Sequence, residues 1–208
     1  SRLIYRKVKR LIDLVLVILS FPFIIPALLL ITLAVYLDTG RPIFFAQSRT
    51  GKGGHRFKMY KFRTMVPNAE EKLKELAAQG LAKLDEEGKL AEPLKLKRDP
   101  RVTRVGRILR KTSLDELPQL INVFKGNMSL VGPRPTSWDV NSYTLLQTER
   151  LSVRPGITGL WQVCSRGNTD FDIWLKWDMK YIEKMSFLLD IKIVIQTFLK
   201  VMKRSGAH

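Results

Sequence analysis

The chain contains one long apolar segment near its N-terminus, followed by a much more polar remainder. Residues 14–37 include no charged side chain, and about 20 apolar residues are enough for a helix to cross the hydrocarbon core of a bilayer. Pro22 and Pro26 lie near the middle of this segment, where each removes a backbone hydrogen bond and favours a kink. The pattern predicts a helix in contact with lipid that is broken or bent at these prolines.

Basic residues lie on both sides of the apolar segment, with Arg6 before it and Arg41 and Arg49 after it. Lys and Arg near membrane helices favour the cytoplasmic side. A re-entrant helix-break-helix hairpin, which enters one leaflet and returns, satisfies both flanks. A simple span stays open as the alternative, because long domains weigh little in this rule. We predict the hairpin for residues 1–39 and a cytosolic, membrane-associated domain for residues 40–208.

The next stretch, PIFFAQSRTGKGGHRFKMYKFRTM (residues 42–65), alternates between apolar and polar positions around a glycine cluster. Two strands joined by a turn show this pattern, whereas the glycine spacing is not that of a phosphate-binding P-loop. On the second strand, the period of two places Lys61 and Arg63 on one face. Two adjacent cations suit a diphosphate, although a solvated strand face would look the same.

Helical periodicity dominates the rest of the chain. Residues 69–91 predict a surface helix with a break near Gly80. Residues 95–111 predict a basic amphipathic helix suited to a membrane surface or to nucleic acid. The stretch FLLDIKIVIQTFLKVMKR (187–204) predicts a further amphipathic helix, at the membrane interface or in the core. We therefore expect an α+β fold that is mostly helical, with a small β-hairpin and amphipathic interface helices around a site.

The net positive charge of the chain indicates a negatively charged partner. The chain has 36 Lys and Arg against 19 Asp and Glu, a formal net charge of +17. Nucleic acid, an anionic membrane surface and phosphorylated substrates all match such a balance. Cys164 is the only cysteine, so no intrachain disulfide can form, and with only two histidines the composition argues against a zinc site.

Two adjacent carboxylates stand out in this basic chain. The stretch TSLDELPQLIN (112–122) sets Asp115 beside Glu116. One interpretation is a capping box, in which Ser113 caps a helix and Glu116 reaches back to the backbone of the cap. A pair of carboxylates kept together for chemistry is the other interpretation, and this stretch alone leaves both open.

Two proline-stiffened turns each carry an arginine. In GPRP, Arg134 lies between two prolines, and in RPGITG, Arg154 precedes Pro155. Proline restricts both its own backbone and that of the preceding residue, so these arginines have less entropy to lose on binding an anion. A purely structural turn is the alternative.

The motifs KFRTM, TSLDELPQLINVFKGNMSLVGPRP and RPGITGLWQV, in this order behind a proline-broken apolar segment, closely resemble the monotopic phosphoglycosyl transferases of the bacterial sugar transferase family. The likeness covers essentially the whole chain. It is nearest to the catalytic domains of the longer undecaprenyl-phosphate galactose or glucose phosphotransferases. Residue 25 is Ile where several relatives have Ser before the proline. Residues 126–129 read GNMS where GDMS is usual, so Asn127 replaces an Asp.

The resemblance implies transfer of a sugar 1-phosphate from a UDP-sugar to polyprenol (undecaprenyl) phosphate, with release of UMP and with Mg²⁺ as cofactor. It places the enzyme at the cytoplasmic face of the bacterial inner membrane, at the first membrane step of glycoconjugate synthesis. By matching positions, Asp115 would be the nucleophile that forms a covalent phosphosugar intermediate, and Glu116 would help to hold the metal. Pro26 falls at the helix-breaking proline of the family.

Chemistry at such a site requires positive charge, because a phosphate monoester must attack a diphosphate. The candidate phosphate-binding cations are Lys61, Arg63, Arg110, Arg134 and Arg154. A carboxylate nucleophile divides the transfer into two displacements and predicts ping-pong kinetics. We expect the helix dipole and the neighbouring cations to lower the pKa of Asp115. Gln162 and Asp178 are candidates for the substrate pocket.

Three other functions compete with this one. A membrane-anchored nucleic-acid binder would use the basic segment, but no recognised nucleic-acid motif accompanies the charge, so we expect no nucleic-acid partner. A non-catalytic membrane scaffold would be indifferent to Mg²⁺ and to UDP-sugars. A different glycosyl transfer to the same lipid would release UDP instead of UMP. The interface helices also leave room for a homodimer.

Overall fold

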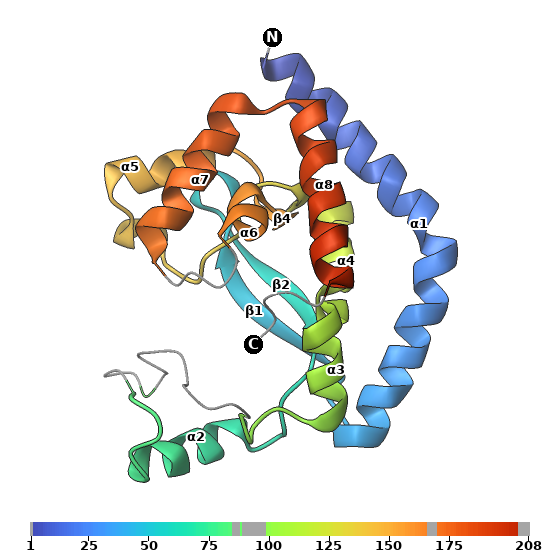
Figure 1. The fold of residues 1–208 in the computed structure, drawn as a ribbon, viewed down its shortest axis with the longest axis vertical. Coiled ribbons are helices and arrows are strands. Elements are labelled where there is room, and N and C mark those ends of the chain that lie inside the picture. The colour runs from blue at the N-terminus through green and yellow to red at the C-terminus, as the bar shows by residue number, and fades with distance from the viewer. Residues whose placement is uncertain (1, 85–87, 89–98, 166–169, 204–208) are drawn as a thin grey trace.

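The computed structural model describes residues 2–84, 88, 99–165 and 170–203. Its longest element is α1 (Arg2–Thr39), a single helix that contains both Pro22 and Pro26. Figure 1 shows α1 bowed around one side of the molecule, with a change of direction near its middle. It is long and apolar enough to cross a membrane, and only 6% of its apolar window is buried, unlike the core helix of a soluble protein.

The predicted β-hairpin is confirmed. Strands β1 (Phe44–Thr50) and β2 (Arg56–Phe62) pair antiparallel. The short 3-10 helix η1 (Lys52–Gly54) joins them, and its Gly53 and Gly54 have φ of 65° and 80°, a backbone conformation that favours glycine. The glycine cluster therefore forms the turn of the hairpin, as its spacing indicated.

The predicted helix of residues 69–91 is shorter than its pattern suggested. Helix α2 covers Ala69–Ala78, and the break near Gly80 is confirmed by the positive φ of 72° at that residue. The segment from residue 81 to 84 is not helical, and residues 85–87 and 89–91 lie outside the described residues. In Figure 1, α2 lies at the opposite end of the molecule from α7.

The basic helix also begins later than expected. Helix α3 covers Arg104–Thr112 and starts at the N-cap Thr103, whose side chain accepts a hydrogen bond from the backbone of Gly106. Val102 instead forms a bridge with Met65, and residues 95–98 lie outside the described residues. A Cβ at position 106 would collide with the backbone of Thr64, so only glycine lets α3 pack directly on the segment that follows β2.

After α3 come the 3-10 helix η2 (Leu114–Glu116) and helix α4 (Gln119–Lys125). A second, parallel sheet of β3 (Ser129–Val131) and β4 (Gly156–Thr158) then brings the two proline-stiffened turns side by side. The elements between and after them are η3 (Val140–Ser142), α5 (Leu145–Thr148), η4 (Glu149–Ser152), α6 (Leu160–Cys164), α7 (Phe171–Lys184) and α8 (Phe187–Met202). The observed fold is mostly helical with small sheets, as predicted.

Helix α1 packs on the rest of the chain along one narrow stripe. Val17 belongs to a buried cluster with Met59 and Val123, and Val35 to another with Phe62. Polar bonds strengthen the N-terminal half of the contact: the carboxylate of Asp13 accepts from Ser129, and Tyr5 and Lys9 donate to Asp190 of α8. Most of the remaining apolar side chains of α1 stay exposed.

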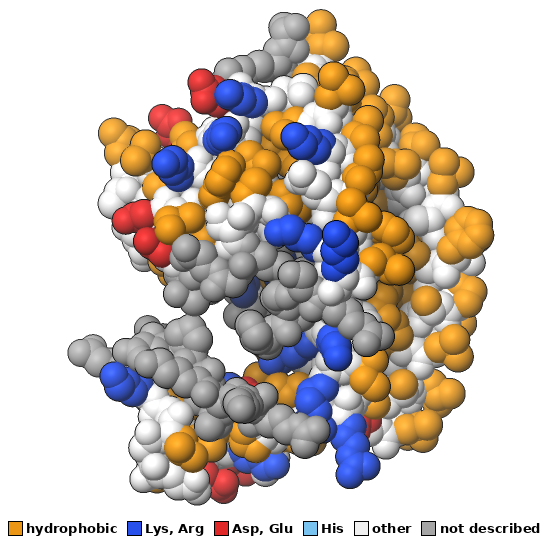
Figure 2. Space-filling model, in the orientation of Figure 1, with side chains coloured by type: hydrophobic (Ala, Val, Ile, Leu, Met, Phe, Trp, Pro, Cys, Tyr) orange, Lys and Arg blue, Asp and Glu red, His pale blue; other side chains and the backbone are white. Residues whose placement is uncertain are grey.

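A continuous apolar surface follows α8 and α1 (Figure 2). On α8, Leu188, Ile191, Ile195, Phe198 and Met202 are exposed at helical spacing. Soluble proteins rarely expose so large an apolar area without a partner. The C-terminal helix is therefore amphipathic, as predicted, with an exposed apolar face suited to contact with a membrane.

Candidate active site

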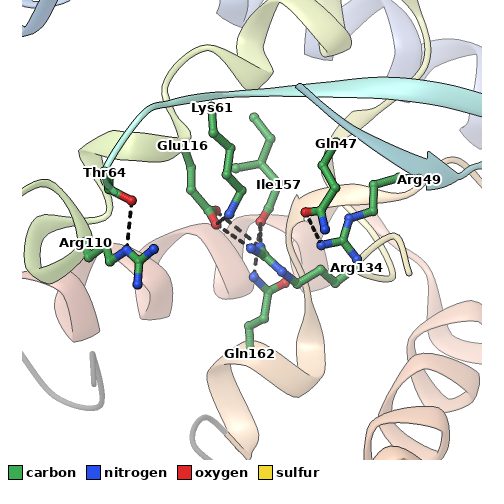
Figure 3. A network of polar contacts seen from close by, with 9 residues as sticks. All are labelled: Gln47, Arg49, Lys61, Thr64, Arg110, Glu116, Arg134, Ile157 and Gln162. Carbon is green, nitrogen blue, oxygen red and sulfur yellow. Dashed lines mark hydrogen bonds and ion pairs between the residues drawn. The ribbon is translucent and has the colours of Figure 1, made fainter. Parts of the chain in front are cut away.

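The carboxylate pair sits in the sharp turn between α3 and α4. Ser113 ends α3 in the left-handed conformation, with φ of 58°, and makes no side-chain capping bond to η2. The capping-box interpretation is therefore wrong. The side chain of Glu116 does not turn back to the cap but extends toward Lys61 on β2 and Arg134 in the turn after β3 (Figure 3).

Glu116 is held by two cations. The Nζ of Lys61, on β2, donates to Oε1 at 2.8 Å, and the guanidinium of Arg134 donates to both carboxylate oxygens. Burial raises the pKa of Glu116, but Arg134 and Lys61 outweigh it and bring the pKa to about 2. Glu116 is therefore ionised at neutral pH and fixed in orientation before any ligand arrives.

Asp115 behaves differently from its neighbour. Only 8% of the residue is exposed, and burial raises its pKa, while Lys61, Arg110 and Arg134 offset this only in part. The expectation of a lowered pKa is therefore wrong. The reason is tertiary: η2 is three residues long, so it has little helix dipole to offer, and burial penalises the charged carboxylate.

Both carboxylates face a pocket of about 780 Å³ between the hairpin, α2 and α3, called the polar pocket because most of the residues that line it are charged or polar. Lys61 and Arg110 also line it, and the Nε of Arg110 is held by the hydroxyl of Thr64 at 2.9 Å. Arg63 lines the same pocket, but its guanidinium donates to the carbonyls of Arg41 and Met65. The volume falls in the range of small-molecule sites, about 300–1,000 Å³.

A second pocket, of about 910 Å³, meets the first at Glu116 and is mostly apolar. Its walls come from α1, through residues such as Ile24, and from α8, through Phe198. Arg134 and Gln162 are among its polar lining residues. Glu116 thus lies where a polar pocket and an apolar pocket join, an arrangement that can bring a charged molecule and the head of a lipid together.

Arg154 does not join the carboxylate pair. Its Nε donates to the carbonyl of Gly126 at 3.0 Å, while Arg10 donates to the carbonyls of Val123 and Phe124. The two arginines thereby satisfy carbonyls at the C-terminal end of α4, a favourable position for cations. These contacts give Arg154 a structural role at the end of α4, and binding of substrate phosphate by Arg154 stays a prediction.

Gln162 and Asp178, the two residues predicted for the substrate pocket, lie in different places. Gln162 lines the apolar pocket and donates through Nε2 to the carbonyl of Ile157, which Arg134 also contacts. Asp178 lies behind the site, 1% exposed, and accepts from Arg150 at 2.6 Å. Burial raises the pKa of Asp178 to about 7 although Arg150 lowers it. Asp178 is linked to the site through Arg150, which donates to the backbone carbonyl of Arg134.

Three residues near the site, Gln47, Arg49 and Thr64, were not predicted from the sequence. Arg49 donates to Gln47 at 2.6 Å, and burial together with Arg134 lowers the pKa of Arg49 to about 10. Thr64 orients Arg110 (Figure 3). The alternation of the strand could have indicated Gln47 and Arg49. Phe45 pairs with Lys61, and Gln47 and Arg49 lie on the same face of β1 as Phe45, because alternate residues of a strand share a face.

The carboxylates of Asp115 and Glu116 are the candidate metal ligands of the site. No group of three or more His, Cys, Asp or Glu side chains that could hold a metal occurs among the described residues. Mg²⁺, however, usually takes one or two carboxylates and completes its shell with substrate phosphate and water. Asp115 and Glu116 fit that need, because a carboxylate has lone pairs beyond those that Lys61 and Arg134 occupy.

Comparison with known proteins gives a consistent set of relatives. A family model described as Bacterial sugar transferase matches residues 4–204. The chain is 42% identical over 205 residues to the Undecaprenyl-phosphate galactose phosphotransferase of Salmonella typhimurium, covering 98% of this chain and 42% of that protein. A UDP-galactose-lipid carrier transferase of Erwinia amylovora is 41% identical, with 98% and 42% covered. The Exopolysaccharide production protein ExoY of Sinorhizobium fredii is 39% identical, with 96% and 88% covered. The chain thus spans less than half the length of the first two relatives.

Proposed function

The chain belongs to the bacterial sugar transferase family, and from this premise we propose that it transfers a sugar 1-phosphate from a UDP-sugar to polyprenol phosphate. The observation that carries the proposal is the position of Asp115 among three cations in the polar pocket, next to Glu116, which lines both the polar and the apolar pocket. The names of the relatives from Salmonella and Erwinia refer to this class of donor and acceptor. The reaction would begin exopolysaccharide or related glycoconjugate synthesis.

The polar pocket suits the donor. Lys61 and Arg110 lie beside Asp115 and supply positive charge where the diphosphate must approach a carboxylate. Such charge is needed before bonds change, since phosphoryl transfer depends mainly on positioning and electrostatic stabilisation. Thr64 limits the freedom of Arg110, so less entropy is lost when an anion binds.

Asp115 would act as the nucleophile in two displacements. In the first, a carboxylate oxygen of Asp115 forms a bond to the phosphorus next to the sugar, the bond from that phosphorus to the bridging oxygen breaks, and UMP leaves. In the second, a phosphate oxygen of the polyprenol phosphate attacks the same phosphorus and releases the carboxylate of Asp115. The burial that raises its pKa also removes water that would weaken it as a nucleophile.

Glu116 would hold Mg²⁺ together with oxygens of the substrate phosphates. When bound, the metal supplies neutralisation of the negative charge on the diphosphate. Lys61 and Arg134 keep Glu116 ionised and oriented for this role. Arg134 itself stands at the boundary of the apolar pocket, where it can bind the acceptor's phosphate.

The apolar pocket suits the isoprenoid chain of the acceptor. It lies between α1 and α8, the two helices that carry the exposed apolar surface. A re-entrant course of α1 in one leaflet, from the cytoplasmic face of the inner membrane, agrees with its bow in Figure 1, with Pro22 and Pro26 inside it and with the basic residues at both flanks.

The nucleotide product tests this function directly. We expect purified protein, given Mg²⁺, undecaprenyl phosphate and radiolabelled UDP-galactose or UDP-glucose, to release UMP with at least one donor. Without acceptor, the label should attach to the protein at Asp115, and Asp115→Asn should abolish both signals. Release of UDP, or a trapped phosphosugar on another residue, would overturn the mechanism.

A further inference from the structure

A separate pocket of about 410 Å³ lies between α6, α7 and α8, away from the carboxylate pair. Its floor is apolar and includes Trp177 and Ile193. Lys180, Lys184 and Lys192 line it and are exposed. The described residues that line this pocket include no acidic side chain. A cationic rim around an apolar floor suits an amphiphile with a negative head.

The positive charge of this pocket is not neutralised from α8. The acidic residue nearest along that helix, Asp190, is buried and accepts hydrogen bonds from Tyr5, Lys9 and Tyr181. At the α6 end, burial raises the pKa of Cys164, whereas Lys180 and Lys192 are among the cations that lower it. The charges of the lysines thus converge on the pocket that Cys164 lines.

The pocket borders the surface suited to the membrane. On α8, Lys192 follows directly after the exposed Ile191, and Leu189 follows Leu188. Figure 2 shows basic side chains over α7 and α8 beside the hydrophobic band. With the apolar face of α8 in the bilayer, the lysines would stand at the level of the headgroups, where basic residues favour anionic lipids.

We propose that the pocket formed by α6, α7 and α8 binds the phosphate headgroup of an anionic phospholipid, whose acyl chains lie along the exposed apolar face of α8. Zwitterionic headgroups fit less well, because their ammonium group is repelled by the three lysines. The proposal rests on the membrane placement of α8 and not on the transfer reaction. Binding here would steady α8, which forms one wall of the acceptor pocket.

Cys164 provides a local probe, because it is exposed, lines the pocket and is the only cysteine. The full chain is solubilised in neutral detergent, and its reaction rate with a maleimide is measured as phosphatidylglycerol or phosphatidylcholine is added. We expect phosphatidylglycerol to slow the reaction severalfold and phosphatidylcholine to leave it nearly unchanged.

The lysine triple variant K180Q/K184Q/K192Q tests the residues. We expect its affinity for phosphatidylglycerol, read from the concentration that protects Cys164, to fall on the order of 100-fold. The matched control K58Q/K72Q/K74Q removes the same charge outside the pocket and should keep the protection. All rates are compared with and without lipid within one variant, so that a changed thiol reactivity cancels.

Three results would overturn the proposal. Equal protection by phosphatidylcholine would mean contact through the apolar face alone. Protection by inorganic phosphate at the same concentration would indicate a site for free anions instead of a lipid. Protection that persists in K180Q/K184Q/K192Q would exclude the lysines. A protein with no transferase activity that still shows lysine-dependent protection would contradict only the proposed function.

Discussion

Replacement of each adjacent carboxylate by its amide should change stability in opposite directions. For Glu116→Gln, we predict a loss of about 3 kcal/mol in the free energy of unfolding at pH 7. The pKa of Glu116 falls from 4.5 to about 2 on folding, and each pKa unit corresponds to about 1.4 kcal/mol. Only 18% of the Glu116 side chain is exposed, so solvent screening removes little of this.

The sign of the pH dependence follows from the lowered pKa. Ionised Glu116 stabilises the fold fully above its unfolded pKa of 4.5, and this contribution disappears as the pH falls through about 2. The difference between wild type and Glu116→Gln should therefore shrink steadily as the pH is lowered from 4.5 toward 2.

Asp115→Asn is the matched control within the same turn. Burial raises the pKa of Asp115 above 3.8, so the ionised carboxylate destabilises the fold once the pH rises beyond that value. We expect Asp115→Asn to preserve or increase stability at pH 7 and to have no such effect at pH values below the unfolded pKa. The two variants differ in sign although both remove one negative charge.

Urea unfolding in neutral detergent micelles, followed by the fluorescence of the 4 tryptophans, measures both variants at several pH values. An equal shift of both variants in the same direction would refute the reasoning, since a general charge effect would then explain them. Full stability of Glu116→Gln at pH 7 would show that the pairs with Lys61 and Arg134 contribute nothing net.

Three further predictions concern other parts of the chain. Lys61→Met should lower kcat/KM for the UDP-sugar about 10- to 100-fold through loss of a charged hydrogen bond. Arg154→Met should instead lower the urea midpoint of unfolding and leave kcat/KM essentially unchanged. A lower kcat/KM with an unchanged midpoint in Arg154→Met would show that Arg154 acts in the site. Wild-type stability should fall as the pH rises from 3.8 to about 7, the range in which Asp178 is ionised in the unfolded chain but still protonated in the fold. Asp178→Asn should remove that slope in urea titrations, and an unchanged slope would contradict the raised pKa. If α1 is re-entrant as proposed, Pro22→Ala with Pro26→Ala should convert it to a span, so that a cysteine substituted for Ser1 reacts with an impermeant maleimide from the periplasmic side. Unchanged labelling from the cytoplasmic side would show that the prolines do not set the course of the helix.

Sequence patterns were informative where the determining interactions are local. The alternation around the glycine cluster predicted the hairpin, because strand pairing across a short turn depends on neighbouring residues. The break near Gly80 followed for the same reason. The resemblance identified Asp115 and Glu116, which both line the polar pocket, and Glu116 also lines the apolar pocket.

The two proline turns show where local pattern stops being sufficient. Arg134 and Arg154 looked equivalent, since each lies next to a proline. Pairing of β3 with β4 brings the turns together, yet Arg134 reaches Glu116 and Arg154 reaches the end of α4. Only the positions of elements distant in the chain decide between these partners.

By itself, then, the sequence determined the apolar helix, the hairpin, the basic character and the carboxylate pair. The tertiary structure decided which cations surround that pair, and it raised the pKa of Asp115 while lowering that of Glu116. The physical reason is that propensity and periodicity act between near neighbours, whereas burial and ion pairing depend on distances across the fold, such as the 2.8 Å between Lys61 and Glu116.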